Sequence, residues 1–395
     1  MLDVYQASIM IIFFVILAIW AYFDRKNIEF KYILFIRKTK RGLKILDRIA
    51  KFKNFWKLVG IIAIISCFVM VIEGLRSIFL VSWLIVSGRI KESLGGLVLP
   101  TPTATPVFGP GFIGLPFIFW IIILPTILFP HEIAHGIMCR LDKIRVKSAG
   151  IILLLILPGA FVEPDENEIK KSKLLTKLRI FSAGSFANFL FACLIFTPFL
   201  GIGILPNIIW PSITTGYLRI VEVNSSSPAG IAGLEAGMII TEINGKKVEI
   251  TYLDFLELNY ISKYAEGLKV GDKINITANG KLYEIPVEEI KLNNITGLYV
   301  GINDRNVMPE PKLNVSAFNF LVNLLTWMWV LNYAVAVLNI MPIYPLDGGL
   351  ILKSITEKIT KKYSDQIVIS VSIITALLVL FTIIGPEIMK ALQFF

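Results

Sequence analysis

The stretch FIFWIIILPTILFPHEIAHG, residues 117–136, joins an almost wholly apolar run to the string His131-Glu132-Ile-Ala-His135. These two histidines are the only histidines in the 395 residues. Four residues make about one helical turn, so both imidazoles project from the same face of a helix and can bind one metal ion. The stretch therefore predicts a metal site on a helix that lies in or near a membrane.

The glutamate between the histidines is suited to be a base and not a ligand. In zinc hydrolases with this spacing, the glutamate takes a proton from the attacking water while the histidines hold the metal. Catalytic zinc usually needs three protein ligands and one open position. Because no third histidine exists, the third ligand must be a carboxylate or a thiolate. The alternative, two ordinary buried histidines, is costly among Ile and Leu side chains.

The composition agrees with a chain that crosses a membrane several times. Hydrophobic residues make up 55% and charged residues 17%, and the mean hydropathy is +0.72. Glu73 and Arg76 interrupt one apolar run a helical turn apart, and we interpret them as a mutually neutralising pair. Runs long enough to span a bilayer predict about six transmembrane helices, at about 8–23, 57–86, 115–141, 180–204, 315–342 and 366–388.

The charges between these runs predict an orientation. Residues 24–57 carry twelve Lys and Arg against three acids, whereas residues 205–312 carry ten basic and thirteen acidic residues. The positive-inside rule places the first segment in the cytoplasm and the second outside the cell membrane, with both termini outside. We interpret the basic stretch 37–57 as contacting anionic lipid and not nucleic acid, because it adjoins a span. The three cysteines form no CxxC pair and indicate no disulfide framework.

The segment at about 212–307 differs in kind from the apolar runs. Alternating apolar residues predict strands at 217–223 and 273–277, and Asn244-Gly245 and Asn279-Gly280 predict tight turns. The order of a strand, Ser227-Pro-Ala, Ala232-Gly-Leu and Gly237 to Gly245 resembles the PDZ domains of bacterial and archaeal proteases.

The PDZ resemblance implies an inserted extracytoplasmic α+β domain that binds extended peptides by adding a strand beside a helix. The alternative is a β-rich domain that binds nothing and spaces or shields the membrane site.

A second motif follows the fifth apolar run, at Asn339-Ile-Met-Pro342-Ile-Tyr-Pro-Leu346-Asp347-Gly348. With the histidine motif and the glycine after it, Gly136, this segment strongly resembles the site-2 protease family of intramembrane zinc metalloproteases. That resemblance implies that one Zn²⁺ is held by His131, His135 and Asp347, with Glu132 as the base.

Two further segments resemble the same family. Gly184-Ser-Phe-Ala-Asn188 fits its Gly-x-x-x-Asn pattern, which implies that Asn188 holds the substrate backbone or stabilises the oxyanion. The alternative is helix packing through small residues. Residues 147–163 resemble its re-entrant β-hairpin, whose edge can pair with an unwound substrate; the alternative is an interfacial loop.

These patterns predict a polytopic α-helical membrane protein with five segments along the chain. Residues 1–110 would hold two spans, a basic cytoplasmic loop and a Pro/Gly-rich loop, with no assigned role. Catalytic membrane segments would lie at 111–211 and 308–352, on either side of a PDZ-like domain at 212–307. A C-terminal span would fill 353–395.

The expected function is that of an intramembrane zinc endopeptidase with its site near the cytoplasmic side of the cell membrane. Its substrates would be membrane proteins with a transmembrane helix, cut after an upstream protease has removed an ectodomain. The alternative is a transporter or ion pathway, in which intramembrane His, Glu and Asp relay protons or pass a metal.

Overall fold

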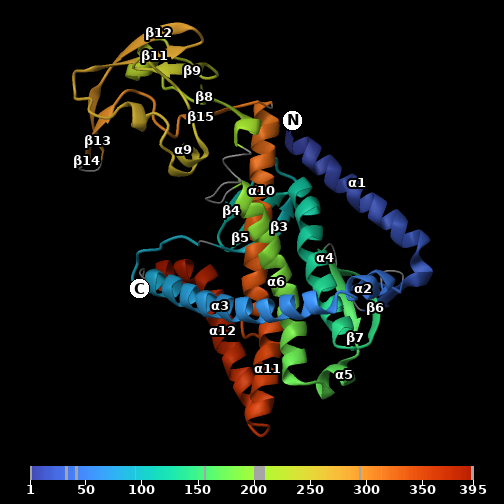
Figure 1. Cartoon of the computed structure of the whole chain (residues 1–395). Coiled ribbons are helices and arrows are strands. Elements are labelled where there is room, and N and C mark those ends of the chain that lie inside the picture. The colour runs from blue at the N-terminus through green and yellow to red at the C-terminus, as the bar shows by residue number, and fades with distance from the viewer. Residues whose placement is uncertain are drawn as a thin grey trace. The chain divides into compact units, whose positions relative to one another are not determined.

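The computed structural model describes residues 2–31, 34–40, 43–93, 95–154, 157–199, 210–292, 295–312 and 314–392. The chain divides into two compact units (Figure 1). Unit 1 comprises Met1–Cys193 and Trp327–Phe395, and unit 2 comprises Leu194–Thr326.

Among the described residues, six helices are long and apolar enough to cross a membrane. This agrees with the six expected spans and fits a polytopic helical membrane protein; the expected end of the fourth span, 200–204, lies outside the described residues. Helices suit this environment because every backbone group in them is bonded within the segment. The six are α1 (Leu2–Phe23), α3 (Lys53–Val86), α4 (Phe117–Leu141), α6 (Leu174–Phe199), α10 (Val315–Ile340) and α12 (Ser364–Leu392).

Shorter helices connect or flank these six. Unit 1 has α2 (Leu43–Ile49), α5 (Glu166–Lys171), α11 (Asp347–Ile359) and the 3₁₀ turn η1 (Arg25–Asn27). Unit 2 has α8 (Pro228–Ile231), α9 (Tyr252–Glu257) and the 3₁₀ turn η2 (Ser262–Tyr264).

Unit 1 contains an antiparallel sheet in the order β1-β2-β6-β7. Its strands are β1 (Ile28–Lys31), β2 (Leu34–Thr39), β6 (Val146–Leu154) and β7 (Leu157–Pro164). The hairpin expected at 147–163 is therefore present as β6 and β7. Part of the segment expected to be a basic cytoplasmic loop instead supplies β1 and β2; the residues of β1, Ile-Glu-Phe-Lys, alternate between apolar and charged. Because β2 covers the far edge of β6, β7 is left as an edge strand.

The Pro/Gly-rich loop expected before α4 also contains strands. β3 (Leu97–Thr101), β4 (Val107–Gly109) and β5 (Phe112–Pro116) form a sheet in the order β3-β5-β4. Pro100 is tolerated in β3 because β3 is an edge strand, where a missing backbone N–H breaks no ladder, and Pro116 is the last residue of the central strand β5.

Helix α3, from the first 110 residues, packs against helices that follow it in unit 1. Figure 1 shows α3 running across α6 and α10 and not alongside them. The Cys67 thiol in α3 donates to the Ser182 carbonyl in α6, at 3.4 Å. Gly74 lies so close to Met341, directly after α10, that an added Cβ would come within 2.4 Å of the methionine methyl carbon. Residues 1–110, which had no assigned role, therefore include a helix that contacts two helices of the core.

Unit 2 is built on an antiparallel sheet and has its own apolar core. The sheet order is β12-β11-β9-β8-β15, with β10 paired to β9. Both Asn-Gly pairs have positive φ at each residue (51° and 70° at 244–245, 49° and 78° at 279–280), as two-residue hairpin turns require. The strands are β8 (Thr214–Ile220), β9 (Ile239–Ile243), β10 (Lys246–Lys247), β11 (Lys273–Ala278), β12 (Lys281–Pro286), β15 (Val307–Pro311) and the separate hairpin β13 (Glu288–Leu292) and β14 (Ile295–Tyr299).

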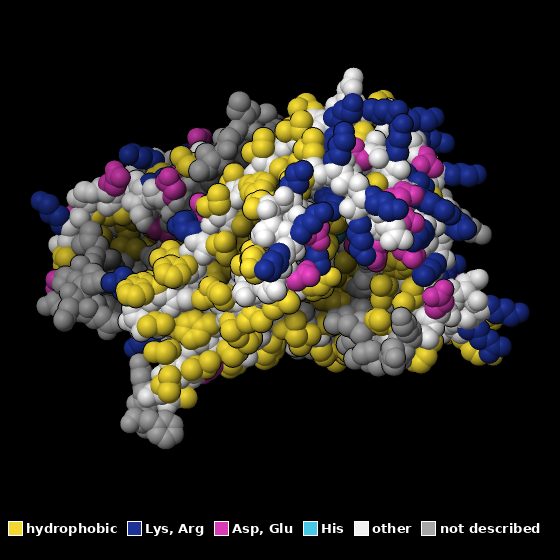
Figure 2. Space-filling model, turned by 90° about the horizontal axis from the view of Figure 1, so that it is seen from below, with side chains coloured by type: hydrophobic (Ala, Val, Ile, Leu, Met, Phe, Trp, Pro, Cys, Tyr) yellow, Lys and Arg dark blue, Asp and Glu magenta, His cyan; other side chains and the backbone are white. Residues whose placement is uncertain are grey.

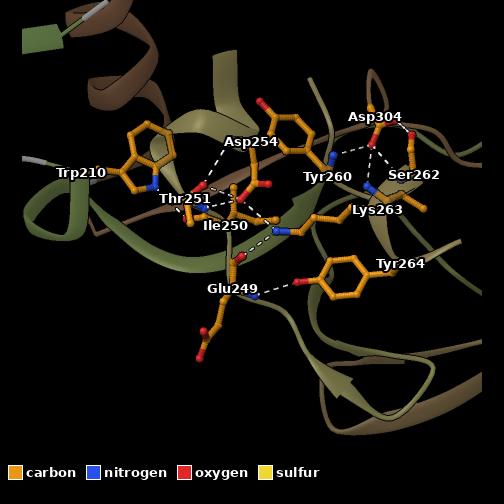
Figure 3. A network of polar contacts seen from close by, with 11 residues as sticks. Trp210, Glu249, Ile250, Thr251, Asp254, Tyr260, Ser262, Lys263, Tyr264 and Asp304 are labelled. Atoms are coloured by element: carbon orange, nitrogen blue, oxygen red, sulfur yellow. Dashed lines mark hydrogen bonds and ion pairs between the residues drawn. The ribbon is translucent and has the colours of Figure 1, made fainter. Parts of the chain in front are cut away.

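A polar network connects the end of α9 to the start of β15 (Figure 3). Oδ1 of Asp304 accepts hydrogen bonds from the backbone N–H groups of Tyr260 and Ile261, at 2.7 and 2.5 Å. Lys263 bonds Asp254 of α9 at 2.9 Å, and that lysine together with the Thr251 cap holds the pKa of the Asp254 carboxyl below its usual value against the opposing effect of burial. The edge strand β15 therefore begins beside the loop that follows α9.

Candidate active site

Three side chains from distant parts of the sequence meet in unit 1. The two histidines lie on α4, and Asp347 is the first residue of α11. The Nε2 atoms of His131 and His135 are 3.1 Å apart, and each is 3.4 Å from Oδ2 of Asp347. All three side chains are shielded, with exposed fractions of 11 to 15%. Among the described residues, this is the one group of His, Cys, Asp and Glu side chains close enough to share a metal ion.

The spacing of these atoms fits tetrahedral zinc. Ligands about 2.0–2.1 Å from zinc at tetrahedral angles lie about 3.3 Å from one another. The observed separations of 3.1, 3.4 and 3.4 Å are close to that value. Nδ1 of His135 donates to the Ile180 carbonyl at 2.7 Å, which leaves Nε2 free to bind metal. Two imidazoles and one carboxylate are also a known donor set for catalytic zinc.

One face of α6 forms the wall of this site. Residues 180, 184 and 188 are four apart and therefore lie on the same side of the helix. The Ile180 carbonyl bonds His135, and the Asn188 amide lies 3.3 Å from Nδ1 of His131. Asn188 is fully buried, and its Oδ1 has no partner among the described residues. Ser185 adds a long hydrogen bond of 3.4 Å to Asp347.

Gly184 explains how α6 comes this close. A Cβ at this position would lie 2.3 Å from Nε2 of His135 and 2.6 Å from Nε2 of His131. Real Cβ atoms do not approach other atoms so closely, so any side chain here would displace the two imidazoles. The glycine of the Gly-x-x-x-Asn pattern therefore leaves space for the ligand nitrogens.

The glycines after Asp347 allow the chain to turn sharply into α11. A Cβ at Gly348 would lie 1.8 Å from the Ile340 carbonyl oxygen, and one at Gly349 would lie 2.4 Å from the Tyr344 backbone nitrogen. The start of α11 thus packs directly against the end of α10 and the loop between them. This close packing fixes the carboxylate at the first residue of α11.

The candidate base is held by the hairpin. Oε2 of Glu132 accepts a hydrogen bond from the backbone N–H of Val162 in β7, at 2.8 Å. Backbone groups alternate in direction along a strand, and the N–H of Val162 points away from β6. The outer edge of β7 therefore lies at the active site, with Glu132 bonded to it.

The structure brings together all five site residues expected from the sequence. The expected ligands surround one point, Asn188 contacts His131, and Glu132 is bonded to Val162 of β7. Sequence reasoning missed Ile180 and Val162, because they act through backbone atoms that any residue has. It also missed Ser185, although this residue could have been noticed as a hydroxyl directly after Gly184 in the Gly-x-x-x-Asn pattern.

Comparison with known proteins identifies a family and several relatives. The family model of peptidase family M50 matches residues 119–383. The uncharacterised protein MJ0971 of Methanocaldococcus jannaschii is 32% identical over 352 residues, covering 87% of this chain and 84% of that protein. A membrane-bound transcription factor site-2 protease homolog of Arabidopsis thaliana is 28% identical over 156 residues, covering 39% of this chain and 28% of that protein.

Proposed function

This chain belongs to peptidase family M50, the family of the site-2 proteases, and we propose that it is a zinc endopeptidase that cuts membrane-spanning segments of other proteins. The observation that carries the proposal is the cluster of His131, His135 and Asp347, whose spacing suits zinc. Beside it on α4, Glu132 is hydrogen-bonded to the edge strand β7. The chain is a multi-pass membrane protein, so the site lies among apolar helices. The alternative, an ion pathway, is not favoured, because family membership and a base bonded to a strand edge both indicate peptide hydrolysis.

The protein's own groups would carry the proton transfers. Bound zinc would polarise the substrate carbonyl and make water more acidic at neutral pH. Glu132 would accept the proton of the attacking water on its carboxylate and pass it to the leaving amine. Its bond to Val162 orients the carboxylate along the edge of β7, where the substrate would lie.

Asn188 would hydrogen-bond both to the metal ligand His131 and to the substrate. A histidine that binds metal through Nε2 carries its proton on Nδ1, where it needs an acceptor. The Asn188 amide lies 3.3 Å from Nδ1 of His131, and its oxygen has no partner among the described residues. Rotation of the amide would let that oxygen accept a hydrogen bond from the Nδ1–H of His131 and would turn the NH₂ group toward the substrate carbonyl. A side-chain amide in that place is suited to stabilise an oxyanion.

The substrate would bind as an extended strand and not as a helix. A peptide bond within a helix is covered by its own backbone hydrogen bonds, and breaking them in lipid leaves polar groups unsatisfied. Pairing with the outer edge of β7 would replace some of those bonds. The Glu132 bond to this edge supports the proposal, because a chain paired there passes the base.

We further propose that the basic end of unit 1 faces the cytoplasm. Figure 2 shows Lys and Arg side chains gathered over part of the lower face, beside a broad apolar area. Together with the acidic balance of residues 205–312, this supports an extracytoplasmic unit 2. Cysteine labelling from outside intact cells tests it: positions near 245 and 280 should react and positions near 40 and 172 should not. Reversed labelling would overturn the orientation.

Unit 2 would be a PDZ-like domain that excludes substrates with bulky ectodomains, so that an upstream protease must act first. The support is the edge of β15. Backbone groups of Asn306 and Lys312 bond to the β8 side at 2.8 and 2.9 Å, so Val307, Pro309 and Pro311 face outward. Proline has no N–H to give, so an added strand would find one donor on this edge, at Val307. A single donor cannot by itself hold a recruited peptide, whereas at β7 the proposed zinc and Asn188 would also bind the substrate. Exclusion is therefore the better role for unit 2.

Zinc content tests the metal site that this function requires. Purified wild type and Glu132→Gln should each hold about one zinc per chain, because the glutamine removes no ligand. Asp347→Ala should hold far less. Zinc content is measured by mass spectrometry of the purified proteins. Equal zinc in Asp347→Ala and wild type would rule out the proposed metal centre.

A further inference from the structure

A cleft of about 520 Å³ opens in unit 1 beside the candidate active site. Its volume lies within the range of about 300–1,000 Å³ that is usual for ligand pockets. Its walls come from the end of β7, from α5, from the first turns of α6, from Tyr344 and from α11. The roles given to the metal ligands, Glu132 and Asn188 do not use this space.

Three lining residues connect the cleft to the groups of the active site. Val162 gives its backbone N–H to Glu132. Phe181 directly follows Ile180, whose carbonyl bonds His135. Leu350 lies one helical turn after Asp347. The cleft therefore borders the segments that position Glu132, His135 and Asp347.

The lining suits a peptide and not a lipid chain. It mixes aromatic and aliphatic side chains with six charged ones: Lys170, Lys177, Lys353, Glu163, Glu166 and Glu357. A second cavity of about 410 Å³, bounded by α1 and the sheet, has one charged residue, Arg37, among apolar side chains. The second cavity resembles a space for acyl chains, whereas the cleft offers both apolar and polar contacts.

The charges of the cleft are already paired. Lys177 bonds Glu357 across α6 and α11 at 3.6 Å, and Lys353 bonds Asp365 at 3.1 Å. The Ser148 hydroxyl, with help from Lys38, holds the pKa of Glu163 below its usual value. Because these charges have partners, the cleft does not need a single strongly charged ligand. A peptide segment of mixed polarity matches it better.

The direction of β7 indicates which part of a substrate would enter. A chain paired with the outer edge of β7 passes Glu132 at Val162. It then continues beside Glu163 and Pro164, which line the cleft. We propose that the cleft binds the polar segment that flanks the substrate's transmembrane helix, directly beyond the bond that is cut. This inference rests on the proposed protease function and adds a second binding region to it.

Photo-crosslinking tests the inference. The probe is a single-span model substrate with a Gly-Pro pair in its span and differently tagged ten-residue polar tails, in liposomes with Glu132→Gln enzyme. A benzoylphenylalanine at position 357, on the cleft, should crosslink only to the tail nearer the bond that wild type cuts, within a few residues of that bond. The same probe residue at position 151, in the second cavity, is the matched control and should not crosslink to that tail. Crosslinks from position 357 to the opposite tail, or none, would overturn the proposal.

A cleft-filling variant gives a second readout. Glu357→Trp should raise the KM for the tailed substrate at least about fivefold and leave the KM for a substrate trimmed at the end of its span unchanged. Lys358→Trp, which puts the same bulk on the exposed neighbouring residue of α11 outside the cleft lining, should behave like wild type with both. Equal kinetics of Glu357→Trp on tailed and trimmed substrates would contradict the cleft's role. Failure of wild type to cut either substrate would instead contradict the protease function.

Discussion

At Gly184, α6 passes so close to the metal ligands that no side chain fits between them. An alanine Cβ would lie 2.3 Å from Nε2 of His135, so Gly184→Ala should move the imidazoles and weaken zinc binding by at least about tenfold. Competition with a chromogenic chelator measures this affinity. Ser185→Ala, which adds no atom beside the rings and loses only a 3.4 Å contact, is the control and should stay within about threefold of wild type. Wild-type affinity in Gly184→Ala would show that the helix can yield.

At the same scale, the sequence predicted the side chains with metal chemistry and missed their backbone partners. His131, His135 and Asp347 could be found because few residue types bind zinc and their spacing is characteristic. Asn188 was found through the family pattern. Val162 and Ile180 could not be found, because a backbone N–H or carbonyl leaves no mark on residue type. Only the fold shows which of them meets the base or a ligand.

Among the elements, the outer edge of β7 determines how a substrate could pair. Glu132 takes the N–H of Val162, and Pro158 and Pro164 have none. Because outward positions recur every second residue, Ala160 holds the last N–H free for a substrate among the described residues. The two natural prolines share this outward phase, so Ala160→Pro is compatible with the hairpin.

Ala160→Pro should lower kcat/KM for a single-span substrate by about tenfold, the effect of one lost hydrogen bond, with zinc content unchanged. Ala160→Val keeps the N–H and adds similar bulk, so it should retain most activity. The loss should also be non-additive with a proline in the substrate at the paired position, because both changes remove the same contact. Additive losses, or full activity in Ala160→Pro, would exclude pairing at Ala160.

The elements themselves were predicted to different degrees. Long apolar runs gave six spans, since only a helix satisfies the backbone in lipid. The β6–β7 hairpin was expected from family resemblance. The strands β1 and β2 were missed because the twelve Lys and Arg in residues 24–57 indicated a basic cytoplasmic loop. The contacts of α3 with the core were also missed, since a uniformly apolar helix does not indicate which face meets protein and which meets lipid.

For the whole molecule, the main prediction concerns unit 2. If it excludes bulky ectodomains, deleting about 213–306 and joining the ends with a flexible linker should permit cleavage of substrates that keep a large ectodomain. If it instead recruits substrate, the same deletion should reduce cleavage of trimmed substrates. Cleavage of matched long and short substrates by both enzymes measures the difference, with zinc content as the control for an intact core. Unchanged discrimination between long and short substrates would rule out the exclusion role.

The central claim is hydrolysis of a peptide bond within a membrane span at the zinc site. The most direct measurement is mass spectrometry of the products formed from a single-span substrate in liposomes, with purified wild type and Glu132→Gln compared at equal zinc content. The account predicts one cut inside the apolar span by wild type and no product from Glu132→Gln, which keeps the ligands and lacks the base. Cuts confined to the soluble tails, or the same products from both enzymes, would contradict it.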